Sequence, residues 1–217
     1  MAQAQTPSRL PSKRTKSGAG GARPVARVSM NFVKLYDQNG NTATPVFTPA
    51  TAITAANKIW YPRAQVQFYV KNNVIFGREL AGNGANIIDW PGMPAIHQRV
   101  ETDIRDVLKK PLASLTLYFC KEILANPRGS IGGRAAYGGP YIMLQDGNAS
   151  IAASVLSHEL GHSLNERHIV ELRADGTENP KFIYLRPNLM YPRSYNGEAL
   201  NTEQRNRANA FARANFR

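Results

Sequence analysis

Three of the four histidines of the chain fall within one eleven-residue run, His158-Glu159-Leu160-Gly161-His162-Ser163-Leu164-Asn165-Glu166-Arg167-His168. The run overlaps residues 149–164, which we expect to form a helix. On a helix, residues four apart project from the same face one turn apart. His158 and His162 can therefore bind one metal ion. Glu159 then lies beside that ion, where it can accept a proton from a metal-bound water.

His168 reaches the same metal only if the helix ends before it. At about 100° per residue, a continued helix would place His168 about 240° away from His162. Asn165 lies between them, and asparagine is second only to glycine in tolerating the left-handed conformation that ends helices. The sequence therefore predicts a turn at Asn165. Three neutral nitrogen ligands leave a fourth position open for water, as in a catalytic zinc site.

The run resembles the motif of the metzincin metallopeptidases, H-E-x-x-H-x-x-G-x-x-H followed by a methionine turn. Asn165 stands where that family has glycine. Downstream, Asn188-Leu189-Met190-Tyr191-Pro192 is similar to the methionine turn, and Leu-Met-Tyr-Pro looks most like the matrixin branch. The order of expected elements is also similar. The resemblance covers residues 25–217, and its specific motifs lie within 132–195.

The resemblance implies an α+β fold: a two-lobed catalytic domain with a twisted mixed sheet, three main helices and an active-site cleft. Residues 1–24 lie before the region of resemblance, and their basic, apolar-poor composition predicts a disordered leader. The upper lobe, with the sheet and active-site helix, would span 25–168. The lower lobe, with the methionine turn and a C-terminal helix, would span 169–217. The implied activity is that of a zinc-dependent endopeptidase holding one catalytic zinc ion.

The resemblance also implies roles for individual residues. His158, His162 and His168 would bind zinc, Glu159 would be the general base, and Met190 would form a hydrophobic floor beneath the metal. An edge strand around Gly138–Leu144 would pair with an extended substrate, and residues 191–195 would form one wall of the pocket for the substrate residue after the cut bond. The expected substrate-binding residues are Gly138, Gly139, Tyr141, Tyr191, Pro192, Arg193 and Tyr195.

The sequence departs from the family in two further places. No matrixin-type cysteine-switch propeptide is visible. Pro192 stands two residues after Met190, where the astacin-like and serralysin-like branches have a tyrosine ligand. We therefore expect no fifth ligand at that position, and Tyr195 is the remaining candidate for one. Arg193 would favour an acidic substrate side chain.

The other elements are expected from residue patterns. We expect strands over 25–36 and 112–124, one strand or a hairpin over 65–76, and a glycine-rich edge strand over 132–144. Thr48-Pro49 should begin a helix over 50–61 that ends at Pro62. We expect a surface loop over 81–94, a short helix over 99–109, a buried Cys120, and a last helix capped by Thr202. The residues expected to anchor that last helix are Leu200, Ala208, Phe211 and Phe216.

Composition limits the remaining possibilities. Hydrophobic residues make up 42% of the 217 residues, enough for a core. Residues 1–27 contain six Lys and Arg and no acidic residue, so half of the net charge of +12 lies there. Such a leader could bind an acidic docking partner or delivery machinery. A single cysteine excludes an intrachain disulfide, and no apolar run is long enough to span a membrane.

Several alternatives stay open at this point. A gluzincin-type site would take its third ligand from a later glutamate such as Glu178. A zinc-containing binding protein, docking on an acidic polymer through the leader, would need no Glu159. Because no secretory signal is visible, the favoured role is a bacterial effector or toxin delivered by a non-classical injection route. A cytoplasmic protease and a secreted protease without its signal are the other options. We expect a monomer, a protein or peptide substrate, and a structural or exposed His97.

Overall fold

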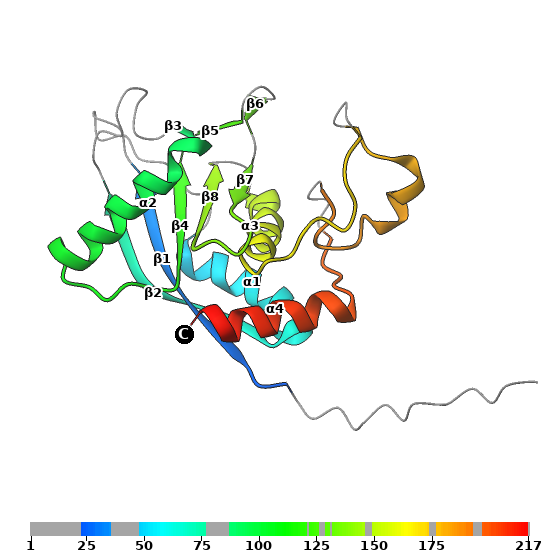
Figure 1. Ribbon diagram of the computed structural model, residues 1–217, viewed down its shortest axis with the longest axis horizontal. Helices are drawn as coiled ribbons and strands as arrows, with labels where there is room; N and C mark the ends of the chain where they lie inside the picture. The colour runs from blue at the N-terminus through cyan, green and yellow to red at the C-terminus, as the bar shows by residue number, and fades with distance from the viewer. Residues whose placement is uncertain are drawn as a thin grey trace, which may run out of the picture.

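The computed structural model describes residues 23–35, 48–76, 87–120, 122–125, 129–130, 132–145, 149–173, 177–192 and 197–216. The predicted leader thus lies almost wholly outside the described residues. The fold is α+β (Figure 1). Its main sheet has five strands in the order β2-β1-β4-β8-β7. They are β1 (Ala26–Leu35), β2 (Val66–Phe76), β4 (Leu115–Cys120), β7 (Gly133–Ala135) and β8 (Tyr141–Gln145).

The main sheet is mixed, as predicted. Strands β1, β2, β4 and β8 are parallel, and β7 runs antiparallel to β8. A second, small sheet joins β3 (Ile87–Asp89), β5 (Glu122–Ala125) and β6 (Gly129–Ser130). The four described α-helices are α1 (Pro49–Ala64), α2 (Met93–Thr102), α3 (Ala149–Ser163) and α4 (Thr202–Asn215).

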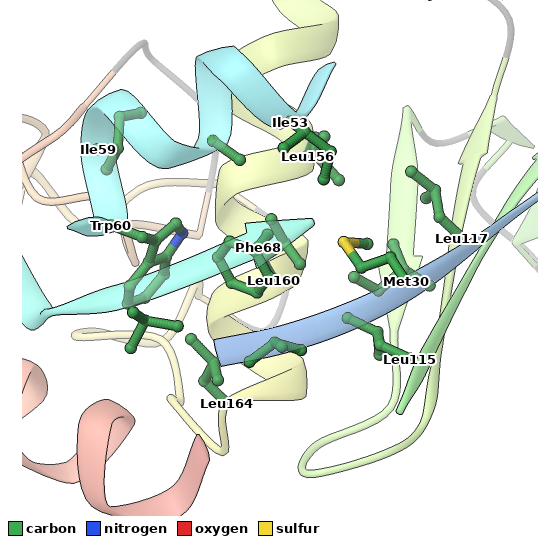
Figure 2. Packing of buried hydrophobic residues seen from close by; sticks show 14 of the residues in the cluster. Met30, Ile53, Ile59, Trp60, Phe68, Leu115, Leu117, Leu156, Leu160 and Leu164 are labelled. Atoms are coloured by element: carbon green, nitrogen blue, oxygen red, sulfur yellow. The ribbon is translucent and has the colours of Figure 1, made fainter. Parts of the chain in front are cut away.

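The main core lies between the sheet and helices α1, α3 and α4. Side chains alternate along β4, so Leu115, Leu117 and Phe119 face this core. Figure 2 shows Phe68 of β2 and Leu160 of α3 at the centre of this cluster, with Trp60 of α1 on one side and Met30 and Leu117 of the sheet on the other. The indole N–H of Trp60 donates to the Ser157 carbonyl over 3.1 Å, which joins α1 to α3.

The opposite face of the sheet carries α2, which lies in front of the strands in Figure 1. Tyr118 and Cys120 point to this side and pack with Met93 and Val100 of α2. Cys120 is buried, as predicted. Among the described residues, no helix combines the length and apolar character needed to cross a bilayer.

Several predicted boundaries are wrong. Helix α1 continues past Pro62 to Ala64 and ends where Gln65 turns left-handed. Proline cannot donate to the Lys58 carbonyl, but the Arg63 guanidinium does so over 3.2 Å, which compensates for the missing bond. The expected loop over 81–94 holds β3, the 3₁₀ turn η1 (Trp90–Gly92) and the start of α2. The helix expected over 99–109 therefore begins earlier, and a π-helical turn, η2 (Asp103–Val107), follows it.

Other expectations are confirmed or refined. Residues 66–76 form one strand rather than a hairpin, and Thr48 caps α1 as predicted. The last helix is capped by Asn201 rather than Thr202. The Asn201 side chain accepts a hydrogen bond from the Gln204 backbone N–H, and the Gln204 side chain accepts one from the Asn201 backbone N–H. The predicted strand over 112–124 is split between β4 and β5, which belong to different sheets.

Candidate metal centre

Helix α3 carries the first two histidines of the run on its last two turns. His158, Glu159 and His162 are buried there. The helix then ends in a Schellman motif, in which the Glu166 N–H donates to the Gly161 carbonyl over 2.8 Å and the Asn165 N–H donates to the His162 carbonyl over 2.9 Å. Asn165 has φ 64°, so the left-handed turn predicted at this residue is confirmed.

The turn brings His168 back to the two helix histidines. His168 Nε2 lies 3.2 Å from His158 Nε2 and 3.2 Å from His162 Nε2. Nitrogen ligands bound tetrahedrally at about 2.0–2.1 Å from zinc lie about 3.3–3.4 Å apart. The three rings thus already have the spacing of ligands around one ion, and this group can hold a metal.

Backbone carbonyls determine which ring nitrogens carry hydrogen. His158 Nδ1 lies 2.7 Å from the Leu189 carbonyl oxygen, and His162 Nδ1 lies 2.7 Å from the Glu166 carbonyl oxygen. A carbonyl only accepts, so each Nδ1 carries the proton and each Nε2 presents a lone pair. Two lone pairs therefore point at the third ring, and a cation placed between the three Nε2 atoms would satisfy both at once, whereas a single N–H of His168 aims at one of them. This donor chemistry fits a metal site with carbonyl support behind its ligands.

The three imidazoles are held neutral, the form that binds metal. Burial is the main cause: it lowers the pKa of His158 to about 3 and the pKa of His168 to about 4. Burial also lowers the pKa of His162. The neighbouring histidines of the group add to the lowering at His158 and His168, because two imidazolium charges so close together repel.

The methionine-turn residues lie directly behind this group. Met190 is fully buried, and a side-chain carbon added at Gly161 would overlap its sulfur. Glycine between the two helix histidines thus lets the turn approach α3 closely. The Ile169 N–H donates to the Met190 carbonyl over 2.9 Å, and the Leu189 carbonyl supports His158. The turn therefore fixes both ends of the ligand set.

Glu159 lies next to the ligands without belonging to the converging group. Glu159 is buried, with 7% of its surface exposed. Burial raises the pKa of Glu159 to about 8, against the opposing effects of Arg134 and of a hydrogen bond from the Ala135 backbone N–H. The carboxyl group is therefore a stronger base than a solvated one, and it is bonded to strand β7.

A pocket of about 640 Å³ opens over the three histidines and Glu159. Strand β7 and the residues after it form one side, and Pro192 lies on the other. Sequence reasoning missed Arg134, Tyr137 and Val155 among the lining residues. Tyr137 is 54% exposed, and its ring stands edge-on to His162 with centroids 4.8 Å apart. The pairing of β7 with β8 brings Arg134 and Tyr137 to the site, whereas Val155 lies on α3 three residues before His158.

The predicted substrate-binding residues are spread over different environments. Tyr141 and Pro192 line the pocket. Gly138 and Gly139 form the turn between β7 and β8, and the Gly138 N–H donates to the His162 carbonyl over 2.9 Å. Tyr191 is buried, with its hydroxyl 3.3 Å from Glu178. Arg193 and Tyr195 lie outside the described residues.

The predicted edge strand around Gly138–Leu144 is wrong. Strand β8 pairs with β4 on one side and β7 on the other, so its backbone is not open to a peptide. The edge strand on this side of the sheet is β7. The glycines of the connecting turn look like edge-strand glycines, so the sequence predicts one strand where the fold has two. The turn at Gly138, where φ is +61°, instead reverses the chain.

A buried ion pair supports the second ligand from behind. The Glu166 side chain is 0% exposed, and Arg207 of α4 binds both of its carboxylate oxygens. The same Glu166 supplies the carbonyl that accepts from His162. Helix α4 is thereby tied to the ligand set. The sequence gives no sign of this pair, because its members are 41 residues apart.

The alternative third ligand, Glu178, has other partners. Arg186 donates to its carboxylate over 2.7 and 3.0 Å, and the Tyr191 hydroxyl does so over 3.3 Å. Among the described residues, the group able to hold a metal consists of His158, His162 and His168. A gluzincin-type ligand set is therefore not the one that the fold assembles.

Comparison with known proteins reveals similarity of fold alone. No protein-family model matches the chain, and no curated protein matches it either. A solved structure described as "Structure of a chaperone-substrate complex" aligns with a TM-score of 0.51 at 14% identity. The alignment covers 89% of this chain and 36% of that one, so this chain spans about a third of the length of its neighbour.

Proposed function

We propose that the chain is a zinc-dependent endopeptidase of the metzincin kind. The observation that carries the proposal is the convergence of three imidazole Nε2 atoms, two of them fixed as lone-pair donors by backbone carbonyls. The left-handed Asn165 and the buried Met190 beneath the ligands support it. The two-lobed, cleft-bearing catalytic domain is part of the same proposal.

In this proposal His158, His162 and His168 hold the ion, and Glu159 is the general base. Zinc bound there would activate a water and polarise the scissile carbonyl. Glu159 accepts the proton of the attacking water and returns it to the leaving amine. Its burial suits both steps, because burial raises the pKa of this carboxyl group from its ordinary value toward neutrality, where a general acid–base group works best.

The substrate would lie along β7. This strand is the last of the main sheet on the side of β8 and borders the pocket above the histidines. An extended peptide can add to such an edge by main-chain hydrogen bonds. Its scissile bond would then pass over Glu159, which is hydrogen-bonded to the same strand. Tyr141 and Pro192 would contact substrate side chains.

The test combines metal analysis with hydrolysis. We expect about one zinc per chain in purified protein, in line with one three-ligand site. We expect casein cleavage that a chelator stops and added zinc restores. Protein that contains no zinc, or cleavage that persists after full chelation, would contradict the proposal.

A zinc-containing binding protein is the second candidate. Its zinc would be structural, and structural zinc sites are closed by four protein ligands. The three-histidine group of the described residues favours the peptidase instead. Docking of the basic leader on an acidic partner and delivery as an effector stay predictions, since they concern residues 1–22, outside the described part of the chain.

A further inference from the structure

Strand β7 passes unusually close to the proposed general base. A side-chain carbon built at Gly133 would lie 2.9 Å from Glu159 Cγ, 2.6 Å from Val155 Cγ1 and 3.0 Å from Leu144 Cδ2. Carbon atoms in van der Waals contact lie about 3.5–4.0 Å apart. Val155 and the stem of Glu159 therefore occupy the space that any other side chain at 133 would fill, and both would have to shift.

The same strand also touches the other end of Glu159. The Ala135 backbone N–H donates to its carboxylate, two residues along β7. In the ladder with β8, Gly133 pairs with Leu144 and Ala135 pairs with Ile142, so both residues lie on the same face of the strand. Strand β7 thus lies close to the Glu159 side-chain carbons at Gly133, where there is no side chain, and contacts the Glu159 carboxylate through the Ala135 backbone N–H.

Resting on the proposed function, we propose that Gly133 is a positioning residue for the general base Glu159. Its missing side chain lets β7 lie directly on the Glu159 stem, so that the carboxylate meets the Ala135 N–H beside the three histidines. A methyl group at 133 pushes the Glu159 side-chain carbons away from β7 and moves the carboxylate from its place beside the three histidines. The histidines themselves need not move, because the three atoms nearest to the added carbon belong to Val155, Glu159 and Leu144.

The chain offers two matched controls. A carbon added at Gly132, one residue earlier, would meet only Val155, at 3.6 and 3.8 Å, which is ordinary contact. A carbon added at Gly92, at the start of α2, would meet nothing within 4 Å. Gly133→Ala, Gly132→Ala and Gly92→Ala therefore add the same methyl group under three degrees of crowding.

The experiment measures zinc content, kcat and KM on a casein-derived peptide, and melting temperature, all in the full chain. We expect Gly133→Ala to keep its zinc and its KM while kcat falls about 100-fold, the size typical of a catalytic group misplaced by about 1 Å. Gly132→Ala should lose far less, and Gly92→Ala should match the wild type. In a Glu159→Gln background, Gly133→Ala should cause no further loss, because residues that act as one unit are not additive.

A second readout does not depend on activity. Glu159→Ala removes the crowded Cγ atom, so Gly133→Ala should lower the melting temperature less in that background than in the wild type. A Gly133→Ala variant that folds only with Glu159→Ala would support the proposal equally. Equal losses in both backgrounds, failure of both variants to fold, or a kcat like that of Gly132→Ala would overturn it. A wild type that hydrolyses nothing would instead overturn the proposed function, and the melting comparison would still test the contact.

Discussion

His97 and the group His158–His162–His168 are two buried histidine environments on opposite faces of one sheet. Burial lowers the pKa of His97 to about 4, close to the values in the group. The partners differ. His97 Nδ1 lies 2.9 Å from the Tyr118 hydroxyl, and its Nε2 lies 3.4 Å from a Glu101 carboxylate oxygen.

This difference teaches what makes a metal site. At His97, Tyr118 is a side-chain donor that can supply a hydrogen, because burial raises the pKa of its phenol and keeps it protonated. In the group of three, backbone carbonyls take the Nδ1 hydrogens and leave lone pairs facing one another. Burial is common to both environments, so the fixed convergence of lone pairs is what separates a histidine group able to hold a metal from a core histidine.

The largest expected effect comes from Glu159, and Glu101 beside His97 is its control. Glu159→Gln should lower kcat by about three orders of magnitude or more, because general acid–base catalysis contributes about 10²–10⁴-fold. It should keep zinc and fold, since glutamine still accepts from the Ala135 N–H. Glu101→Gln, beside His97, is the control and should leave kcat unchanged. The measurement is peptide hydrolysis with zinc analysis, and near-wild-type turnover in Glu159→Gln would remove the assigned role.

The histidines themselves give the next largest effect. His168→Ala should weaken zinc binding by at least about 100-fold, since loss of mere supporting partners already costs about 10–100-fold. His97→Gln should bind zinc as the wild type does, because its ring lies outside the converging group. Competition against a zinc-sensing dye measures both affinities. Equal affinities in the two variants would break the distinction between the environments.

The parts of the site set by local spacing could be predicted from the sequence. Helical periodicity placed His158 and His162 together, and the backbone preference of asparagine placed the turn at Asn165. Both depend on residues within one run of the chain. The cap of α1 at Thr48 was predicted for the same reason, since its hydrogen bond joins residues three apart.

The parts set by tertiary packing could not be predicted. Whether 132–144 is one strand or two depends on what pairs with each side of β8. Arg207 meets Glu166 only because the fold brings α4 to the residues that follow α3, and Gly133 lies close to the Glu159 stem only because β7 passes beside α3. Such contacts depend on register and helix placement, which no local pattern records.

The Glu166–Arg207 pair tests how the carbonyl behind His162 is held. Arg207→Ala should lower the free energy of unfolding by about 2 kcal/mol, less than the ~3–5 for pairs buried on both sides. Arg207 is 42% exposed, whereas Glu166 is fully buried. Glu203→Ala is the control, because it removes only the 82%-exposed partner of the same arginine and should cost no more than about 0.5 kcal/mol.

The deficit of Arg207→Ala should also depend on pH. Burial raises the pKa of Glu166, and Arg207 opposes that rise. Without the arginine, the folded carboxyl binds its proton at higher pH than the unfolded one. The stability of the variant should therefore be lost as pH rises through the folded pKa and regained toward the unfolded value of about 4.3. Denaturant unfolding of the metal-free protein measures this, and a deficit independent of pH would show that Glu166 is not the cause.

The smallest expected effect concerns the turn at Asn165, which brings His168 to the two helix histidines. Asn165 has φ 64°, where side chains are strained and glycine is not. Asn165→Gly should therefore be as stable as the wild type or slightly more so. Asn165→Val should lose about 1 kcal/mol or more, because a β-branched residue resists the left-handed region. Its zinc affinity should fall as well, because the Schellman bonds that aim His168 at the helix are weakened. Calorimetry and zinc competition on both variants make the test. Equal melting temperatures and equal zinc affinities would show that His168 is brought to the group by its other contacts, chiefly the bond from Ile169 to Met190, and not by the turn.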